Sequence, residues 1–107
     1  MVESAYVVVF ITTPSAAEAQ KISRLLLEQK KAACVNIIPA VASAYWWEGK
    51  IESATESLLM VKTSARLLPD LVSLVKSVHS YRVPEIIALP VSGGNQDYLE
   101  WIDRSLA

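Results

Sequence analysis

The segment from Ala32 to Lys62 constrains the fold more than any other, because it predicts two long strands joined by one tight turn. Glu48-Gly49-Lys50 forms that turn, in which Gly49 can adopt a positive φ without steric cost. Each arm has about a dozen residues, well above the usual five or six, and would reach about 40 Å at roughly 3.3 Å per residue. A domain of this size has a radius of gyration of only about 13 Å. We therefore expect the hairpin tip to project beyond the core.

The sequence before this hairpin predicts one strand and one helix. Residues 5–11 are continuously apolar and β-branched, which is typical of a central strand. Ser15 and Glu18 have the spacing of a capping box, so a helix is expected over residues 16–30.

The sequence after the hairpin predicts a helix, a strand and a last helix. Thr63 or Ser64 can cap the first of these helices, provided that Pro69 lies in its first turn. The apolar run at 86–91 predicts a strand, and Asn95 is a suitable cap for the last helix.

This order of elements predicts an α+β fold: a ferredoxin-like βαββαβ sandwich with an extended β-hairpin and an extra C-terminal helix. We expect residues 1–107 to form a single domain of this type. The first and third strands would be central. Proline cannot donate to a strand ladder, so the arm that contains Pro39 should be bulged or lie at the edge.

Composition restricts the class of partner. The chain of 107 residues is 52% hydrophobic and 20% charged, with a net charge of −1, which indicates a globular protein. It has no basic cluster larger than Lys30-Lys31, so we expect neither nucleic acid nor an anionic membrane as a partner. The N-terminus reads as a strand, not a signal peptide. The single cysteine fits a reducing compartment, so a cytoplasmic location is expected.

The aromatic end of the hairpin predicts self-association. Tyr45, Trp46 and Trp47 lie together with few charges beside them, and a long exposed edge ribbon is usually covered by another chain. We expect Tyr45, Trp46 and the Pro39 edge to form this contact. The alternative is a hairpin folded back over its own sheet, with the tryptophans in a local core. Cyclic closure would bury repeated edges, but these residues alone do not distinguish a dimer from a trimer.

His79 is the only histidine, and two interpretations of it stay open. It can cap the end of the second helix and favour its dipole. Alternatively, it can bind a metal or carry a proton, with Glu85 orienting its ring. One histidine and one cysteine cannot complete a transition-metal site in a single chain, so a metal site would have to be shared between subunits.

Two further residues have both a structural and a chemical interpretation. Cys34 begins the edge strand, where a buried, inert thiol is favoured over a reactive thiol or soft ligand. Lys62 ends the ribbon and could form a surface ion pair with Glu56 or Glu85. We find no set of nucleophile, base and orienting residue, so we do not expect an enzyme.

Several motifs, spread over nearly the full length from Tyr6 to Trp101, resemble those of the CutA family of divalent-cation tolerance proteins. The matching stretches are Ala32-Ala33-Cys34-Val35-Asn36, Ile38-Pro39, Tyr45 with Trp47-Glu48-Gly49-Lys50, Lys62-Thr63, His79 and Tyr81 with Pro84-Glu85, Leu89-Pro90, and Asp97-Tyr98-Leu99 with Trp101.

This resemblance implies a ferredoxin-like protomer in a tightly packed homotrimer, with the long ribbons pairing between subunits. It also implies a role in tolerance of, or response to, divalent metals, with copper binding reported for bacterial members. Animal relatives are associated with anchoring of acetylcholinesterase at membranes. The family is not an established enzyme family.

Two departures from the family pattern concern the metal. The chain has His79-Ser80-Tyr81-Arg82 where the family often has His-Pro-Tyr-Glu, so a cation replaces a carboxylate. Copper-binding bacterial members carry a cysteine at the position of Ile11 and a second histidine at that of Val78. Only His79 carries over as a ligand. We therefore expect no firmly bound cofactor, and only weak binding of a divalent ion such as copper.

The residues expected to form an intersubunit cleft around His79 are Tyr81, Glu85, Lys62 and Trp47. The main hypothesis is a non-enzymatic trimer linked to metal response. One alternative is a trimeric signalling module of the PII type, which senses a small anionic ligand. The other is a structural or partner-binding assembly that uses the aromatic hairpin tips.

Overall fold

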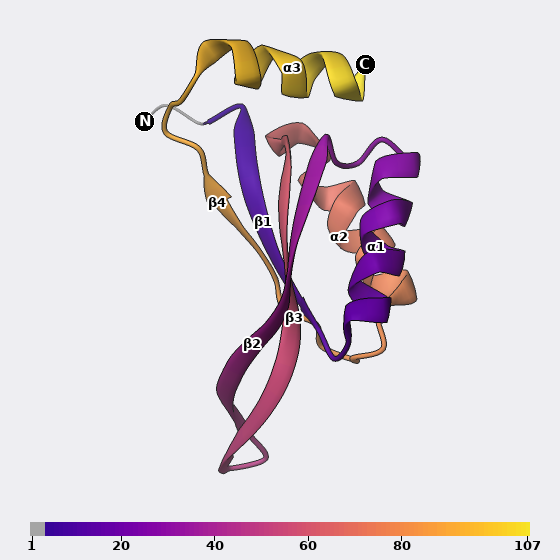
Figure 1. Cartoon of the computed structure of the whole chain (residues 1–107), viewed down its shortest axis with the longest axis vertical. Coiled ribbons are helices and arrows are strands. Elements are labelled where there is room, and N and C mark those ends of the chain that lie inside the picture. Colours follow the sequence, from indigo (N-terminus) through magenta and orange to yellow (C-terminus); the bar gives the residue numbers. More distant parts are fainter. Residues whose placement is uncertain (1–3) are drawn as a thin grey trace.

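The computed structural model describes residues 4–107 as a four-stranded sheet with three α-helices (Figure 1). The elements in chain order are β1 (Tyr6–Thr13), α1 (Ala16–Glu28), β2 (Cys34–Trp47), β3 (Lys50–Ser64), a 3-10 turn (Ala65–Leu67), α2 (Leu68–Val78), β4 (Ile86–Pro90) and α3 (Gln96–Leu106). This order confirms the predicted α+β, ferredoxin-like arrangement with an additional C-terminal helix.

The sheet has the strand order β2-β3-β1-β4, and all three pairings are antiparallel. The first and third strands are therefore central, and the arm that contains Pro39 is an edge, as predicted. Helices α1 and α2 cover one face, whereas α3 lies across the end of the sheet (Figure 1). There α3 packs Ile102 and Leu106 against Leu67.

The core lies between the sheet and helices α1 and α2. Alternate residues of β1 are buried, and they pack with alternate residues of β3 and with the inner faces of both helices. No helix of residues 4–107 covers the opposite face of the sheet (Figure 1), and on β4 the side chains of Ile87 and Leu89 are exposed there. The fully buried hydrophobic residues are Val9, Ile11, Ala19, Ile22, Leu26, Leu59, Val61, Leu71 and Val75.

The β2–β3 hairpin projects beyond this core (Figure 1) and gives the molecule extents of 43 × 32 × 22 Å. Strand β1 ends at Thr13, opposite Ser57, so residues 50–56 pair with β2 alone. The turn has positive φ at both Glu48 (50°) and Gly49 (79°), as a tight hairpin requires. The radius of gyration is 14.4 Å, above the value of about 13 Å expected for a rounder chain.

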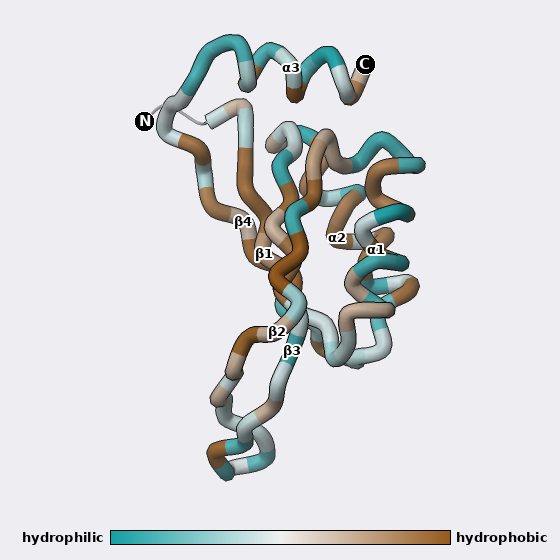
Figure 2. The backbone as a smooth tube through the Cα atoms, in the orientation of Figure 1, coloured by the Kyte–Doolittle hydropathy of each residue, from teal (hydrophilic) through white to brown (hydrophobic). Residues whose placement is uncertain are grey.

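The predicted exposure of the aromatic tip is confirmed. Trp46 is 72% exposed and Trp47 is 52% exposed, which excludes a hairpin folded back over its own sheet. Figure 2 shows largely apolar strands within the sheet and mostly paler positions along the free hairpin.

Strand β2 bulges where it leaves the sheet. Pro39 and Ala40 together lie opposite the single residue Ser57, since the register shifts between Ile38 and Val41. The Ser57 hydroxyl donates to the carbonyl oxygen of Pro39 at 2.7 Å. The predicted effect of Pro39 is thus confirmed: it lies at both an edge and a bulge.

Several element ends differ from the predicted ones. Helix α1 ends at Glu28, and Lys30 adopts a φ of 58°. Thr63 and Ser64 do not cap α2, because both belong to β3 and Thr63 donates its hydroxyl to the carbonyl oxygen of Lys31. Helix α2 instead begins after the 3-10 turn, with Pro69 in its first turn as predicted.

The last strand and helix agree more closely with the prediction. Strand β4 ends one residue early, at Pro90. Asn95 caps α3 by accepting a hydrogen bond from the backbone N–H of Asp97 at 3.0 Å. Across residues 4–107, none of the helices combines the length and apolar character that a membrane crossing demands.

Candidate functional site

His79 follows the last residue of α2, and its backbone N–H and both ring nitrogens have hydrogen-bond partners. Its backbone N–H donates to the carbonyl oxygen of Val75 at 2.9 Å, so His79 is the C-cap of α2, but its ring contacts Thr12 and Tyr81 and not the helix carbonyls that it was predicted to cap. Its ring Nδ1 accepts from the backbone N–H of Tyr81 at 3.0 Å, and Nε2 lies 2.7 Å from the carbonyl oxygen of Thr12. Since Nδ1 is an acceptor, the ring is neutral with its proton on Nε2. The side chain is 0% exposed, so a metal ion could bind only if one of these hydrogen bonds broke.

Glu18 connects the start of α1 to the residues after His79. Its N–H donates to the Ser15 hydroxyl at 3.2 Å, which confirms half of the predicted capping box. Its carboxylate does not return to the helix start, because Oε2 accepts from both the N–H and the hydroxyl of Ser80 at 3.0 Å. Partial burial opposes ionisation of Glu18, but the two Ser80 hydrogen bonds and the positive charge of Lys21 favour the carboxylate, and its pKa is lowered.

Glu18, not Glu85, is the carboxylate beside the His79 ring. Its Oε2 lies 3.4 Å from Nδ1. The expectation that Glu85 orients the ring is therefore wrong. Thr12 and Tyr81 fix the ring directly, and they come from β1 and from the segment after α2.

Tyr81 connects the same segment to the base of the hairpin. Its hydroxyl donates to Oε2 of Glu56 at 2.8 Å, and its ring lies 5.0 Å from that of His79. Partial burial, together with the hydrogen bond to Glu56 and its charge, raises the pKa of Tyr81 to about 12. Glu56 is only 7% exposed.

Sequence reasoning missed this role of Glu56, which it considered only as a partner for Lys62. One signal was present: Glu56 is an acidic residue in an alternating row with Leu58 and Met60, which are apolar. A charge in such a row is expected to meet a polar partner.

A groove between the hairpin and the segment after α2 brings many of these side chains together. We call it the hairpin groove, and its volume is about 1060 Å³. Trp47, Tyr81 and Glu85, three of the residues expected to form a cleft, line it together with Tyr45 and Trp46. Its full lining is Thr12, Ala42, Ser43, Ala44, Tyr45, Trp46, Trp47, Glu48, Glu56, Tyr81, Arg82, Val83 and Glu85.

Lys62, the fourth expected cleft residue, lies elsewhere. It pairs with Cys34 near the C-terminal end of β3, whereas Glu56 lies near the middle of that strand, and its ammonium donates to the side-chain oxygen of Asn36. The predicted ion pairs with Glu56 and Glu85 are absent from the described part of the chain.

Cys34 is half-buried, whereas a buried thiol was expected. It lies beside Lys62 and Asn36, outside the lining of the hairpin groove. Its Sγ lies 3.9 Å from the side-chain oxygen of Asn36. Burial, followed by a hydrogen bond to Cys34, raises the pKa of the neighbouring Tyr98, which stacks on Trp101. Within residues 4–107, no three His, Cys, Asp or Glu side chains gather in a way that could hold a metal.

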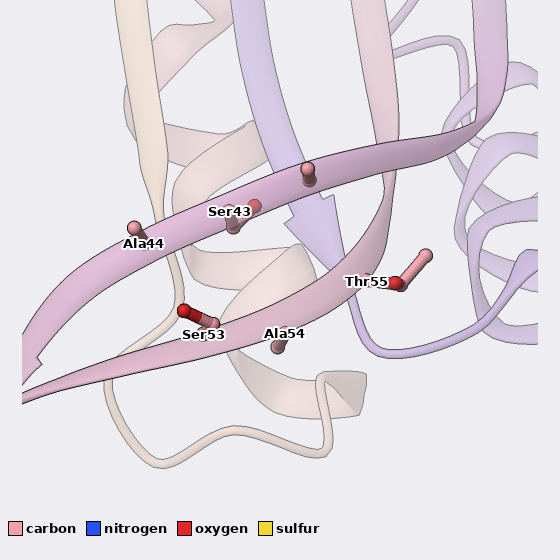
Figure 3. A pocket seen from close by; sticks show the side chains of 6 residues that line it. Ser43, Ala44, Ser53, Ala54 and Thr55 are labelled. Carbon is pink, nitrogen blue, oxygen red and sulfur yellow. The ribbon is translucent and has the colours of Figure 1, made fainter.

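A second hollow lies along the arms of the hairpin. Its volume is about 450 Å³, and Figure 3 shows that only small side chains border it. None of these side chains is ionisable, so the hollow has no charged group with which to bind a ligand. The bordering residues are Ala42, Ser43, Ala44, Ser53, Ala54 and Thr55.

The profile of the CutA1 divalent ion tolerance protein family matches residues 7–105. The protein CutA 1, chloroplastic, of Oryza sativa is 46% identical over 99 residues, which cover 92% of this chain and 56% of that protein. The divalent-cation tolerance protein CutA of Archaeoglobus fulgidus is 47% identical over 98 residues, covering 92% of this chain and 95% of that protein. Human protein CutA is 50% identical over 93 residues, covering 87% of this chain and 52% of that protein.

The solved structures agree with these sequence comparisons. That of the periplasmic divalent cation tolerance protein CutA from Archaeoglobus fulgidus has a TM-score of 0.93 at 44% identity, covering 95% of this chain and 99% of that one. The chain spans about half the length of its plant and mammalian relatives. Relatives are named as chloroplastic and periplasmic, so a cytoplasmic location stays a prediction. The chain belongs to the CutA1 family of divalent ion tolerance proteins.

Proposed function

We propose that this chain assembles as a homotrimer that contributes to tolerance of, or response to, divalent metal ions, copper among them, without catalysing a reaction. Membership of the CutA1 family supports the link to divalent ions. The observation that carries the assembly is the projecting hairpin, whose free part cannot be covered by the core of its own chain.

Unpaired backbone and exposed apolar side chains both favour contact with further copies. Strands β2 and β4 are sheet edges, and β3 lacks a second neighbour over residues 50–56. Near the tip, Ile51 is 67% exposed and lies opposite Trp46. Between the bulge and the tip, the small side chains in Figure 3 leave the backbone accessible to another strand. A ring of copies would cover every hairpin in the same way.

Sedimentation velocity tests the assembly. We expect one species of three times the 11.7 kDa chain mass over a wide range of protein concentration. Ile51→Lys places a charge at the tip without removing a backbone hydrogen bond, so it should weaken the assembly. The control Leu27→Lys changes a residue of similar size on α1 that is also exposed, and it should leave the trimer intact. A wild-type monomer would refute the proposal.

The hydrogen bonds of His79 support weak binding of copper at most, because both ring nitrogens already have partners. Calorimetric titration of Cu²⁺ into wild type and His79→Ala tests this expectation. We expect a low affinity that falls further in the variant. His79→Gln, which keeps a polar group in the buried site, separates loss of a ligand from loss of folding, and circular dichroism monitors folding. Tight binding that is unaffected by either substitution would contradict the assignment of His79.

The charges of the hairpin groove do not favour a sensor of small anions. Among the described residues that line it, Arg82 is the one cation, against the carboxylates of Glu48, Glu56 and Glu85. The exposure of Trp46 does favour the other alternative, an assembly that binds a protein partner through its hairpin tips. That role predicts that Trp46→Ala abolishes partner pull-down, while removal of His79 leaves the cellular metal response unchanged.

A further inference from the structure

We propose that α3 opens as one unit, by rotation about residues 92–94, while the sheet and helices α1 and α2 stay folded. This motion uncovers the end of the sheet, where α3 packs on Leu67 and its Tyr98 lies beside Cys34. It involves neither His79 nor the free part of the hairpin, so it does not depend on the proposed metal response or on the number of subunits.

Helix α3 has an apolar cluster of its own. Its residues Ile102 and Leu106 pack with Leu67, whereas the core between the sheet and helices α1 and α2 is a different cluster. Figure 1 shows α3 across the end of the sheet, apart from the other two helices. Among the described residues, the two clusters share no member, so α3 can leave without disrupting the core.

The segment before α3 has the features of a hinge. Val91 is still held, because its N–H donates to the carbonyl oxygen of Tyr6 at 3.0 Å and its own carbonyl accepts from the Ser4 hydroxyl at 2.6 Å. Residues 92–94 are exposed, and they form no hydrogen bond with the rest of the described range 4–107. A Cβ at either of their glycines would meet no atom within 4 Å. Rotation at this segment therefore breaks no contact.

Two hydrogen bonds hold the other end of α3. The Tyr6 hydroxyl donates to Asp103 at 2.6 Å, and the Lys30 ammonium donates to the carbonyl oxygen of Ser105 at 3.0 Å. This carbonyl lies in the last turn of α3, where carbonyl groups have no partner within the helix. Both contacts lie at exposed positions, so water can replace them when the helix opens.

Lys30 is an unusual residue for its position. Its N–H and that of Lys31 donate to the carbonyl oxygens of Leu27 and Leu26, which is the Schellman arrangement at the end of a helix. Lys30 therefore has a φ of 58°, a conformation for which glycine is the usual choice. A strained residue indicates a function for its side chain, and the contact of this side chain with α3 supplies one.

Native-state hydrogen exchange of the assembled protein, at low urea concentrations, tests the opening. We expect the amides of residues 100–105 to exchange at one common rate, on the order of ten times faster than those of β1. Their rate should also depend less on urea, because opening α3 exposes less surface than complete unfolding does.

Two matched substitutions distinguish this opening from complete unfolding. Ile22→Val removes one methylene from the core and should speed exchange in β1 about fivefold. It should leave α3 unchanged, because Ile22 stays packed whether α3 is closed or open. Ile102→Val makes the same change beneath α3 and should speed exchange in α3 about fivefold.

A second pair of variants tests the lysine. Lys30→Met removes the ammonium but keeps an unbranched side chain, and it should speed exchange in α3 about threefold. Lys76→Met removes an exposed positive charge from α2 and should leave the exchange of α3 unchanged.

Four results would overturn the proposal: exchange in α3 as slow as in β1, acceleration of α3 by Ile22→Val, equal rates in Lys30→Met and Lys76→Met, or rates that rise steadily toward Ala107, as fraying of the helix end would give. Sedimentation of the same samples keeps this inference separate from the proposed function. A trimer in which α3 exchanges only with the core refutes the opening alone, and a monomer in which α3 opens refutes the assembly alone.

Discussion

Replacing Tyr81 by phenylalanine tests whether its hydroxyl fastens the segment after α2 to the base of the hairpin. The change removes the hydrogen bond to Glu56 and leaves a carboxylate that is 7% exposed without this donor. Hydrogen bonds to charged groups contribute about 1.5 to 3 kcal/mol, and solvent screening reduces this value because Tyr81 is only half-buried. We therefore expect the free energy of unfolding to fall by about 1 to 2 kcal/mol at pH 7.

Urea unfolding at a fixed protomer concentration measures this loss, since association changes apparent stability. The same substitution in a Glu56→Gln background should cost less, because a neutral acceptor binds the hydroxyl more weakly. Tyr6→Phe is the matched control. The Tyr6 hydroxyl donates to Asp103 at 2.6 Å at an exposed site, where solvent can replace the lost bond.

The pH dependence of stability gives a second measurement of the same contact. The pKa of Tyr81 is about 12 in the folded chain, against an ordinary value of 10.0. The folded state thus keeps a proton that the unfolded chain loses, so the contribution to stability is complete below pH 10 and disappears as the pH rises to 12. The difference in stability between wild type and Tyr81→Phe should shrink over this interval. An equal cost in both Glu56 backgrounds, together with a pH-independent difference, would refute the role of the hydroxyl.

Two other substitutions test two contributions to stability separately, the packing of the core and the backbone geometry of the hairpin turn. Leu59→Ala empties a fully buried position and should lower the free energy of unfolding by about 2 to 5 kcal/mol in thermal or urea melts, whereas Leu27→Ala at an exposed position should cost far less. Gly49→Ala meets no atom within 4 Å, so only its φ of 79° opposes a side chain, and we expect a loss of about 1 kcal/mol. Gly93→Ala, without a positive φ, serves as the control and should be nearly neutral.

Local sequence patterns were sufficient to predict the architecture. A continuous β-branched run, a proline within a strand and a glycine between two long arms each restrict the backbone on their own. They predicted the central position of β1, an edge or a bulge at Pro39, and the projecting tip. Thr63 and Ser64 were misassigned because a hydroxyl suits a helix cap and a strand end equally well. Only the tertiary contact of Thr63 with the carbonyl oxygen of Lys31 distinguishes the two.

The candidate site was harder to predict because its contacts join distant parts of the chain. Glu18 and Ser80 are 62 positions apart, and Glu56 and Tyr81 are 25 apart. Both contacts depend on the path of the segment after α2 toward β4, which contains no helix or strand pattern. The sequence singled out His79, whose role as a metal ligand stays a prediction, but its ring partners could not be known before that path was.

A small change of angle at the Pro39–Ala40 bulge is amplified at the tip of the hairpin. The tip lies about 25 Å beyond it, at roughly 3.3 Å per residue, so a rotation of about 10° at the bulge moves the tip by roughly 4 Å. The hydrogen bond from the Ser57 hydroxyl to the carbonyl oxygen of Pro39 lies at the bulge, where this rotation would occur. Deleting Ala40 would remove the bulge and keep Val41 opposite Glu56, so the strand would straighten and the tryptophans would project in a new direction.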